Sequence, residues 1–204
     1  MRTLLLGTRN PDKVIEITSI LADAGWSFSS LQEFPNVGEA EENFMTFAEN
    51  AIAKAQFYAS ATGLCALADD SGLEVAALDG APGVFSARYA GAHATDADRR
   101  TLLLSELARI EDAGRRARFV AVVAISRPDG EILNVSEGIC EGTITFAPRG
   151  TGGFGYDPLF IPDGYDQTFA ELPDTIKNQI SHRARALMGT REFLSSLDHP
   201  RPRS

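Results

Sequence analysis

The sequence predicts an α/β fold from the spacing of its apolar residues. Short apolar runs typical of buried strands, at residues 4–6 and 64–68, alternate with segments whose apolar residues recur every three or four positions. A chain of 204 residues is long enough to bury a core without disulfides. We therefore expect one domain over residues 1–204, with a frayed tail from about residue 198.

The first half of the chain is expected to run strand, helix, strand, helix, strand. After the strand at residues 4–6, Asn10 followed by Pro11 marks a helix start, because asparagine caps helices and proline fits the first helical position. This helix should stop at Gly25. A strand near residues 27–31 then precedes a helix over about 43–62. The strand at 64–68 should end at Asp69-Asp70.

The second half contains turns, a hairpin and further helices. Residues 80–91 are rich in turn formers, and Thr95 begins a capping box that should open a helix to about residue 110. Strands over 119–126 and 131–141 should form a hairpin around residues 128–130. A short strand should follow the glycine-rich loop at 150–157. Thr168 is expected to cap a brief helix, and the last helix should cover about 181–197.

The composition excludes several classes of protein. A net charge of -9 argues against binding a nucleic-acid polymer, which requires a broad basic surface, but a single nucleotide needs only a local group of cations. No apolar run is long enough to cross a membrane or to resemble a signal peptide. Cys65 and Cys140 lie far apart in sequence, which favours reduced thiols in a cytoplasmic protein.

The few lysines single out three segments. Only Lys13, Lys54 and Lys177 are lysines among the 19 basic residues. A compact ammonium on a flexible stem meets phosphate as a point charge, which a planar guanidinium does not reproduce. Lys177 also precedes His182-Arg183 at the start of the last helix, where backbone N–H groups attract acceptors. These segments therefore favour a nucleotide site, although lysines on solvated helix faces are the ordinary alternative.

The glycine-rich run at residues 150–155 matches the spacing of a dinucleotide-binding loop but not its context. Such a loop must open a helix, and Pro158 and Pro162 follow here instead. What remains is a glycine loop presenting Phe154 and Tyr156, which could stack on a base. A tight turn with two buried aromatic residues explains the same sequence, and both interpretations stay open at this point.

Two adjacent carboxylates, Asp69 and Asp70, indicate a cation site. Neighbouring carboxylates repel each other unless a cation stabilises them, and α/β folds place ligands at strand ends. With Glu42 and Glu49 on the polar side of the second helix, the oxygen ligands for Mg²⁺ are present. An aspartyl phosphatase, a zinc site and a serine hydrolase are each poorly supported, because the residue spacings that they require are missing.

The motifs together resemble the inosine triphosphate pyrophosphatase family, whose bacterial members are of the Ham1 type. The matching blocks occur in order over nearly the whole chain. They are Thr8-x-Asn10-x-x-Lys13, Glu41-Glu42, Phe47-x-Glu49-Asn50-Ala51, Lys54-Ala55, Ala68-Asp69-Asp70-Ser71-Gly72-Leu73, Gly80-Ala81-Pro82-Gly83, Ser86-Ala87-Arg88-Tyr89, Gly152-Gly153-Phe154-Gly155-Tyr156-Asp157-Pro158 and Ser181-His182-Arg183. Arg9 fills a variable slot of the first block, and the tail beyond His199 lies outside the resemblance.

The resemblance implies a long mixed β-sheet with flanking helices, two lobes around a central nucleotide-binding cleft, and a homodimer. It also implies a house-cleaning reaction that needs Mg²⁺, in which a purine nucleoside triphosphate (ITP, dITP or XTP) and water give the monophosphate and pyrophosphate. By position, Glu42 and Asp70 would ligate Mg²⁺, and Asp70 would also act as the catalytic base. The substrate-binding residues would be Thr8, Arg9, Asn10, Pro11, Asp12, Lys13, Lys54, Ser71, Phe154, Gly155, Tyr156, Asp157, Lys177, His182 and Arg183.

Two other functions remain possible from the sequence. A pyrophosphatase of the Maf type would share the sheet but prefer other modified or pyrimidine nucleotides. A nucleotide sensor without activity would keep the cations and lose the acidic metal set, whose members are all present here. The roles of Glu49, Asp69 and Arg88 stay open.

Overall fold

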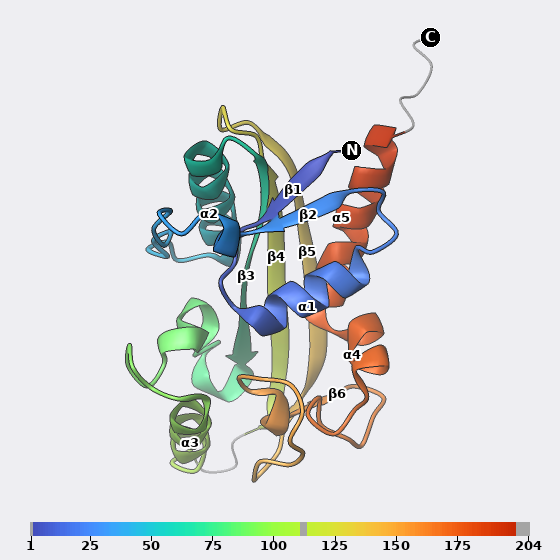
Figure 1. Cartoon of the computed structure of the whole chain (residues 1–204). Helices are drawn as coiled ribbons and strands as arrows, with labels where there is room; N and C mark the ends of the chain where they lie inside the picture. Colours follow the sequence, from blue (N-terminus) through green and yellow to red (C-terminus); the bar gives the residue numbers. More distant parts are fainter. Residues whose placement is uncertain (1, 111–113, 199–204) are drawn as a thin grey trace. The chain divides into compact units, whose positions relative to one another are not determined.

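The structure is a computed structural model that describes residues 2–110 and 114–198. Figure 1 shows the helices and strands of the described residues. The chain divides into two compact units. Unit 1 comprises the described parts of residues 1–70, 121–138 and 183–204, and unit 2 comprises those of 71–120 and 139–182. The prediction of one domain over the whole chain remains a prediction, and the expected frayed tail lies, from residue 199, outside the described residues.

A six-stranded mixed sheet confirms the predicted α/β class. Its strand order is β2-β1-β3-β4-β5-β6, with β1 parallel to both β2 and β3 and with β6 antiparallel to β5. The strands are β1 (Thr3–Leu6), β2 (Ser27–Ser30), β3 (Cys65–Val75), β4 (Arg116–Ser126), β5 (Ile132–Ile144) and β6 (Phe160–Pro162). The long strands β3, β4 and β5 each contribute residues to both units.

In unit 1, helices cover both faces of the sheet. The side chains of β1 alternate between these two faces. Leu4 and Leu6 pack in a core with residues of α1 (Pro11–Ile20) and α5 (His182–Asp198). Leu5 points to the other face, where it packs with Tyr58 of α2 (Phe47–Thr62). All three leucines are buried, which explains why β1 is apolar at consecutive positions instead of alternating with polar residues.

Unit 2 has its own core, built from the far ends of the long strands. Helix α3 (Asp96–Leu107) adds Leu103 and Leu107 to this core, which also contains several aromatic rings. The ring of Phe119 lies 4.7 Å from that of Phe160 and 6.1 Å from that of Phe169, between centroids. Helix α4 (Asp174–Ile180), which the sequence did not predict, packs Ile176 and Ile180 against this core.

Strand β3 corrects the expectation that Asp69 and Asp70 end a strand. It runs for 11 residues, so both carboxylates lie in its middle. The expectation was wrong because Ser71 and Gly72, which are small or polar residues typical of strand ends, lie inside this strand. The rule that α/β folds place ligands at strand ends still applies here, because the neighbouring strand β1 ends beside these residues. Its pairing with β3 stops at Leu6 and Leu67.

Two helix predictions also differ from the structure. Helix α2 begins at Phe47 with Thr46 as its N-cap, rather than near residue 43, so Phe44 lies before the helix and is 46% exposed. Thr168 caps a hydrogen-bonded turn rather than a helix: its carbonyl accepts from the N–H groups of Glu171 and Leu172, both at 3.0 Å. Pro173, which follows at once, removes the next backbone donor and stops the turn from extending.

Candidate active site

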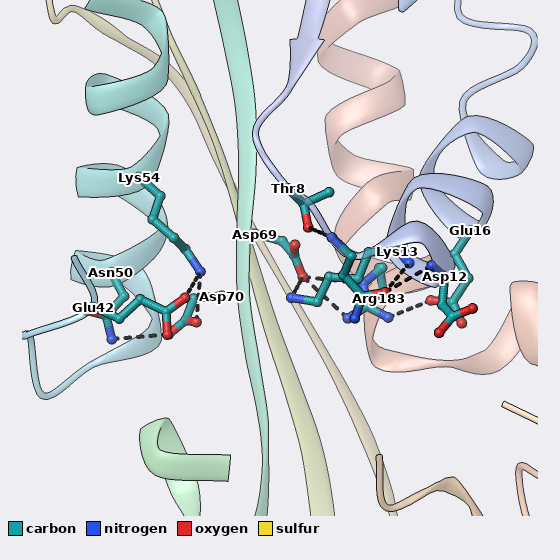
Figure 2. A network of polar contacts seen from close by, with 11 residues as sticks. Thr8, Asp12, Lys13, Glu16, Glu42, Asn50, Lys54, Asp69, Asp70 and Arg183 are labelled. Atoms are coloured by element: carbon teal, nitrogen blue, oxygen red, sulfur yellow. Dashed lines mark hydrogen bonds and ion pairs between the residues drawn. The ribbon is translucent and has the colours of Figure 1, made fainter. Parts of the chain in front are cut away.

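Asp69 and Asp70 point to opposite faces of β3, because successive side chains of a strand alternate (Figure 2). Asp70 turns toward α2, whereas Asp69 turns toward α1 and the start of α5. The two carboxylates therefore belong to different side-chain clusters. Both clusters lie within unit 1.

The first cluster, which we call the α2 cluster, consists of Glu42, Asn50, Lys54 and Asp70. The Lys54 ammonium lies 2.7 Å from a Glu42 oxygen and 3.0 Å from Oδ1 of Asp70. The Asn50 amide donates to Oδ2 of Asp70 at 3.1 Å, from one turn earlier on α2. Asn50, Lys54 and Asp70 are buried, while Glu42 arrives from the loop before the helix. Two carboxylates thus share one cation.

Burial and repulsion set the charge balance of the α2 cluster. Burial raises the pKa of Asp70, and the nearby Glu42 carboxylate raises it further, so that the Lys54 ammonium does not bring it back to its ordinary value. Burial also lowers the pKa of Lys54, but the surrounding carboxylates, led by Asp70, outweigh this effect and raise it overall. Asp70 is thereby a carboxylate that accepts a proton more readily than usual.

The second cluster, which we call the α1 cluster, consists of Lys13, Glu16, Asp69 and Arg183. Oδ2 of Asp69 lies 2.9 Å from the Lys13 ammonium and accepts two hydrogen bonds of 3.3 Å from the Arg183 guanidinium. The remaining side of Arg183 donates to Glu16, three residues after Lys13 on the same helix. Arg183 is 1% exposed and Asp69 2%, so the middle of this chain of ion pairs is buried, whereas Lys13 and Glu16 at its ends are partly buried.

The α1 cluster shifts the pKa of its aspartate in the opposite direction. Burial would raise the pKa of Asp69, but the cations around it, led by Lys13 and Arg183, hold it far below the ordinary value of 3.8. Burial lowers the pKa of Lys13, and its attraction to Asp69 only partly restores it. Asp69 is therefore a permanent anion between two cations.

The start of α1 places most of the first predicted motif. The Asn10 side chain caps the helix by accepting from the N–H groups of Asp12 at 2.9 Å and Lys13 at 3.3 Å. Thr8 in turn accepts from the N–H of Asn10 at 3.2 Å. Pro11 occupies the first turn, as predicted, and the Arg9 guanidinium donates to the carbonyl of Val37. The motif thus builds the N-terminus of the helix that carries Lys13.

The glycine loop forms a third cluster, in unit 2, with Phe154, Asp157 and Lys177. The Lys177 ammonium lies 2.7 Å from Oδ2 of Asp157, and both side chains are 5% exposed. The same oxygen accepts from the N–H of Phe154 at 2.9 Å. The ammonium also lies 4.9 Å from the centroid of the Phe154 ring, within the range of a cation–π contact. We call these residues the loop cluster.

The two aromatic residues of the loop have different environments. Tyr156 is 4% exposed and belongs to the core of unit 2, and its hydroxyl donates to the carbonyl of Ser86 at 3.1 Å. Burial raises its pKa strongly. Phe154 is only partly buried. Phe154 therefore matches the stacking alternative, and Tyr156 matches the alternative of a buried aromatic residue.

The remaining predicted residues are divided between the units. His182 lies in unit 2 and stacks on Phe119, with ring centroids 4.6 Å apart and an angle of 11° between the planes, while Arg183 lies in unit 1. Ser71 is the first residue of unit 2, within β3. Of the residues left open, Glu49 bonds to the N-cap residue of α2, and the Arg88 guanidinium lies 5.1 Å from the centroid of the Phe85 ring.

Sequence reasoning gave no role to Glu16 or to Asn50, although Asn50 belongs to one of the matching blocks. The helical period held the signal for both, because Glu16 lies three residues after Lys13 and Asn50 four residues before Lys54. Neither residue type stands out by itself. Only the burial of their partners makes them important.

The carboxylates of the α2 cluster fit a hard divalent cation. Glu42 and Asp70 already converge on one cationic group, the Lys54 ammonium. Among residues 2–110 and 114–198, no three His, Cys, Asp or Glu side chains form a metal-binding group by themselves. Mg²⁺ needs no such cage, because it is usually held by one or two carboxylates together with substrate phosphates and waters.

No helix in the described part of the chain has the length and apolar character needed to cross a membrane.

Comparison with curated proteins gives relatives over nearly the full length of the chain. A dITP/XTP pyrophosphatase from Desulforamulus reducens is 50% identical over 194 residues, which cover 95% of this chain and 96% of the relative. A dITP/XTP pyrophosphatase from Thermus thermophilus is 48% identical over 200 residues, covering 98% of this chain and 94% of the relative.

Solved structures and a family model agree with these relatives. A HAM1 protein from Coxiella burnetii superposes with a TM-score of 0.89 at 43% identity, covering 96% of this chain and 100% of that one. The model of the Ham1 family matches residues 4–193, which include every cluster described above. The chain therefore belongs to the Ham1 family.

Proposed function

We propose that this protein hydrolyses the purine nucleoside triphosphates ITP, dITP and XTP to the monophosphate and pyrophosphate, and so clears deaminated purines from the nucleotide pool. The observation that carries the proposal is the convergence of Glu42 and Asp70 on the Lys54 ammonium. Carboxylates for a metal ion and an ammonium for phosphate are the groups that phosphoanhydride hydrolysis needs in one place. The names of the relatives, dITP/XTP pyrophosphatases, support the same reaction.

The triphosphate is proposed to bind in unit 1. Lys13 and Lys54 supply ammonium groups, and the N-terminus of α1 adds backbone N–H groups and the positive end of a helix dipole. Thr8 and Asn10 hold that terminus in shape and are proposed to contact phosphate oxygens. Arg9, Pro11 and Asp12 complete this segment. Because Lys54 is held between two carboxylates, its ammonium is already oriented toward the group of residues that would bind the metal ion.

Glu42 and Asp70 are proposed to hold Mg²⁺ together with phosphate oxygens of the substrate. When bound, Mg²⁺ neutralises charge that develops on the phosphates and on the pyrophosphate leaving group. The side chains around it have separate tasks. Asn50 fixes one oxygen of Asp70 by its 3.1 Å hydrogen bond, which leaves the orientation of the carboxylate well defined.

Asp70 is also proposed to orient the attacking water toward the α-phosphorus and to accept its proton. A general base works best when its pKa approaches the working pH, and burial together with the Glu42 carboxylate raises the pKa of Asp70. Asp69 is a poor candidate for this task, because its cationic neighbours lower its pKa strongly. The same β-strand thus supplies one carboxylate suited to proton transfer and one suited to structure.

The purine base is proposed to bind to the residues around the loop cluster. Phe154 would stack on the ring, with Gly155, Tyr156 and Asp157 shaping the loop. Lys177, His182 and Arg183 would donate to the keto oxygen at purine C6, and Ser71 would make a further contact. Adenine carries an amino group there, which leaves such donors unpaired, and a mismatch of this kind is worth up to ~10⁴-fold in selectivity.

Release of pyrophosphate from a panel of nucleotides tests the reaction. With purified protein and excess Mg²⁺, we expect kcat/KM for ITP, dITP and XTP to exceed that for ATP by at least ~100-fold. A preference for modified pyrimidine nucleotides would instead favour the Maf-type activity. Binding of nucleotides without any turnover would favour a sensor.

Two substitutions test the proposed recognition of the base. Arg183→Ala should lower the ratio of kcat/KM for ITP to that for ATP. In the proposed pocket the keto oxygen of ITP accepts from Arg183, whereas the amino group of ATP does not. Phe154→Ala should lower both values by similar factors, since stacking tolerates any purine. Equal losses on both substrates in the Arg183 variant would move that arginine to a structural role, in keeping with its contacts to Asp69 and Glu16.

The assembly and location complete the proposal. We expect a homodimer, which light scattering on the purified chain measures directly. The acidic net charge of -9 supports a single nucleotide, rather than a nucleic-acid polymer, as the partner. The two thiols, Cys65 and Cys140, lie far apart in the sequence, in keeping with a cytoplasmic location.

A further inference from the structure

Two side chains of α3 hold the glycine loop by a single residue. Oδ2 of Asp96 accepts from the N–H of Gly155 at 2.7 Å, and the Arg100 guanidinium donates to the carbonyl of Gly155 at 2.7 Å. Asp96 and Arg100 are one helical turn apart, so both side chains leave the same face of the helix. Both peptide groups of Gly155 are therefore bound to α3. We call this pair the α3 clamp.

The α3 clamp binds Gly155, the residue after Phe154, and the loop cluster binds the backbone of Phe154 itself. The N–H of Phe154 donates to Asp157, whose carboxylate is fixed by Lys177. Gly155 has a φ of 59°, a conformation that other residues adopt with strain. The backbone on both sides of the Phe154 side chain is thus fixed by charged groups.

Asp96 is well suited to this task because its own position is fixed. Arg99 pairs with it and also donates to the carbonyls of Ala87 and Ala94, at 2.7 and 2.8 Å. Although burial raises the pKa of Asp96, its hydrogen bonds to Arg99 and Gly155 lower it overall, so the side chain stays an anion. A charge-assisted bond of this kind is about twice as strong as a neutral one.

The physical need for the clamp follows from the composition of the loop. Glycines occupy positions 150, 152, 153 and 155, and glycine loses more backbone freedom on ordering than any other residue. If a ligand had to order this segment, that entropy would be lost from binding. Contacts that order the loop beforehand avoid the loss.

We propose that Asp96 and Arg100 are positioning residues for purine binding, which fix Gly155 so that the Phe154 ring is held ready to stack on the base. This inference rests on the proposed role of Phe154 in binding the purine. The clamp acts through the backbone of the loop and touches neither the phosphates nor the metal ligands. Its loss should weaken binding of the base and leave the chemical step intact.

The test uses graded substitutions and a matched control on the same helix. Asp96→Ala and Arg100→Met remove the two contacts, while Asp96→Asn and Arg100→Lys keep an acceptor and a donor. Asp98→Asn is the control, because Asp98 belongs to the same helix N-terminus but bonds to Thr95 and not to the loop. We expect KM for ITP to rise about tenfold in the removing variants, with kcat within about twofold. The conservative variants and the control should lie closer to the parent.

Three further measurements separate positioning from a general structural effect. Amide hydrogen exchange in peptides covering residues 150–157 should become faster in the clamp variants, and the thermal unfolding midpoint should follow that of Asp98→Asn. Inhibition by tripolyphosphate, which has no base, should not change. Most directly, Asp96→Ala and Arg100→Met should cause no further rise in KM in a Phe154→Ala background, because both act through the same ring.

The outcomes distinguish this inference from the proposed function. If Phe154→Ala impairs ITP hydrolysis but the clamp variants keep the parental KM, the positioning role is wrong and base binding by Phe154 stands. Equal losses in the parent and the Phe154→Ala background, or a weaker tripolyphosphate inhibition, would show a general structural effect and would also overturn it. If Phe154→Ala behaves like the parent, base binding by Phe154 itself fails, and the inference fails with it.

Discussion

The α2 cluster and the α1 cluster flank the same strand, yet they differ in their balance of charge. In the α2 cluster two carboxylates, Glu42 and Asp70, share the single Lys54 ammonium. The α1 cluster contains two carboxylates and two cations, which alternate in the order Glu16, Arg183, Asp69 and Lys13. The first cluster therefore has one negative charge in excess and favours an added cation. The second is already neutral.

This difference shows how one Asp-Asp pair supplies two kinds of carboxylate. The alternation of a β-strand sends adjacent side chains into different surroundings, and the surroundings then move their pKa values apart (Figure 2). Asp70, with its raised pKa, is suited to ligation and proton transfer. Asp69, with its lowered pKa, is suited to holding Lys13 and Arg183 in place. The following predictions test that division, in order of decreasing effect.

The largest effect is expected from Asp70→Asn. An amide is a poorer ligand for Mg²⁺ and cannot accept a proton from water, so kcat for ITP should fall by about 10²- to 10⁴-fold. The fold should persist, because Glu42 still pairs with Lys54. Pyrophosphate release and urea unfolding measure the two properties. A kcat close to that of the parent would remove Asp70 from its proposed role.

Asp69→Asn should act on stability before activity. It leaves the buried Arg183 and the partly buried Lys13 without their shared anion. Breaking a buried ion pair in this way typically costs about 3–5 kcal/mol, so we expect the free energy of unfolding to fall by about 3 kcal/mol. Urea unfolding at neutral pH tests this. The comparison between the clusters fails if Asp69→Asn is as stable as Asp70→Asn.

The two aspartates should also give opposite dependences of stability on pH. Asp69 has a lowered pKa in the folded state, so its contribution is complete above pH 3.8 and is lost as the pH falls further. Asp70 has a raised pKa, so its ionisation destabilises the folded state as the pH rises above 3.8.

Unfolding free energies at a series of pH values, without metal ions, measure these contributions. Relative to the parent, the deficit of Asp69→Asn should shrink in acid below pH 3.8, and Asp70→Asn should become relatively more stable as the pH rises from 3.8 toward neutrality. If the stability of both variants relative to the parent changed in the same direction with pH, the assignment of two environments would be contradicted.

The smallest effect is expected from Lys13→Arg and Lys54→Arg. Each keeps the charge but replaces a compact ammonium with a wide, planar group, so kcat/KM for ITP should fall by about tenfold in each. Stability should change little, since a guanidinium can still pair with Asp69 or Asp70. Steady-state kinetics at fixed Mg²⁺ test this, and parental values for both variants would mean that the placement of the lysines is coincidental.

Elements with strong local signals were predicted correctly from the sequence. Asn10 with Pro11 begins α1, and the capping box at Thr95 begins α3, because a cap depends on a few neighbouring residues. The turn at residues 128–130 joins β4 to β5, as the N–H of Arg127 donating to the carbonyl of Glu131 shows. Lys54, Glu42 and Asp70 also lie close together, while their roles as phosphate and metal ligands remain predictions.

Elements without such signals were predicted less well. Strand β3 continues through Ser71 and Gly72 because neighbouring strands of the sheet support it, and a local pattern does not contain that support. Helix α4 has seven residues, too short for a clear periodic signal. The burial of Tyr156 depends on a core formed by residues from distant parts of the chain.

By itself, the sequence determined the α/β class, the starts of α1 and α3, the acidic and lysine-bearing segments and the family. Those properties reside in residue type and short spacing, which are present in the unfolded chain as well. Only the tertiary structure decided that Asp69 and Asp70 serve different clusters, that Arg183 pairs with Glu16, and that α3 holds Gly155. Each of these depends on burial and on contacts between distant residues, and both arise only when the chain packs.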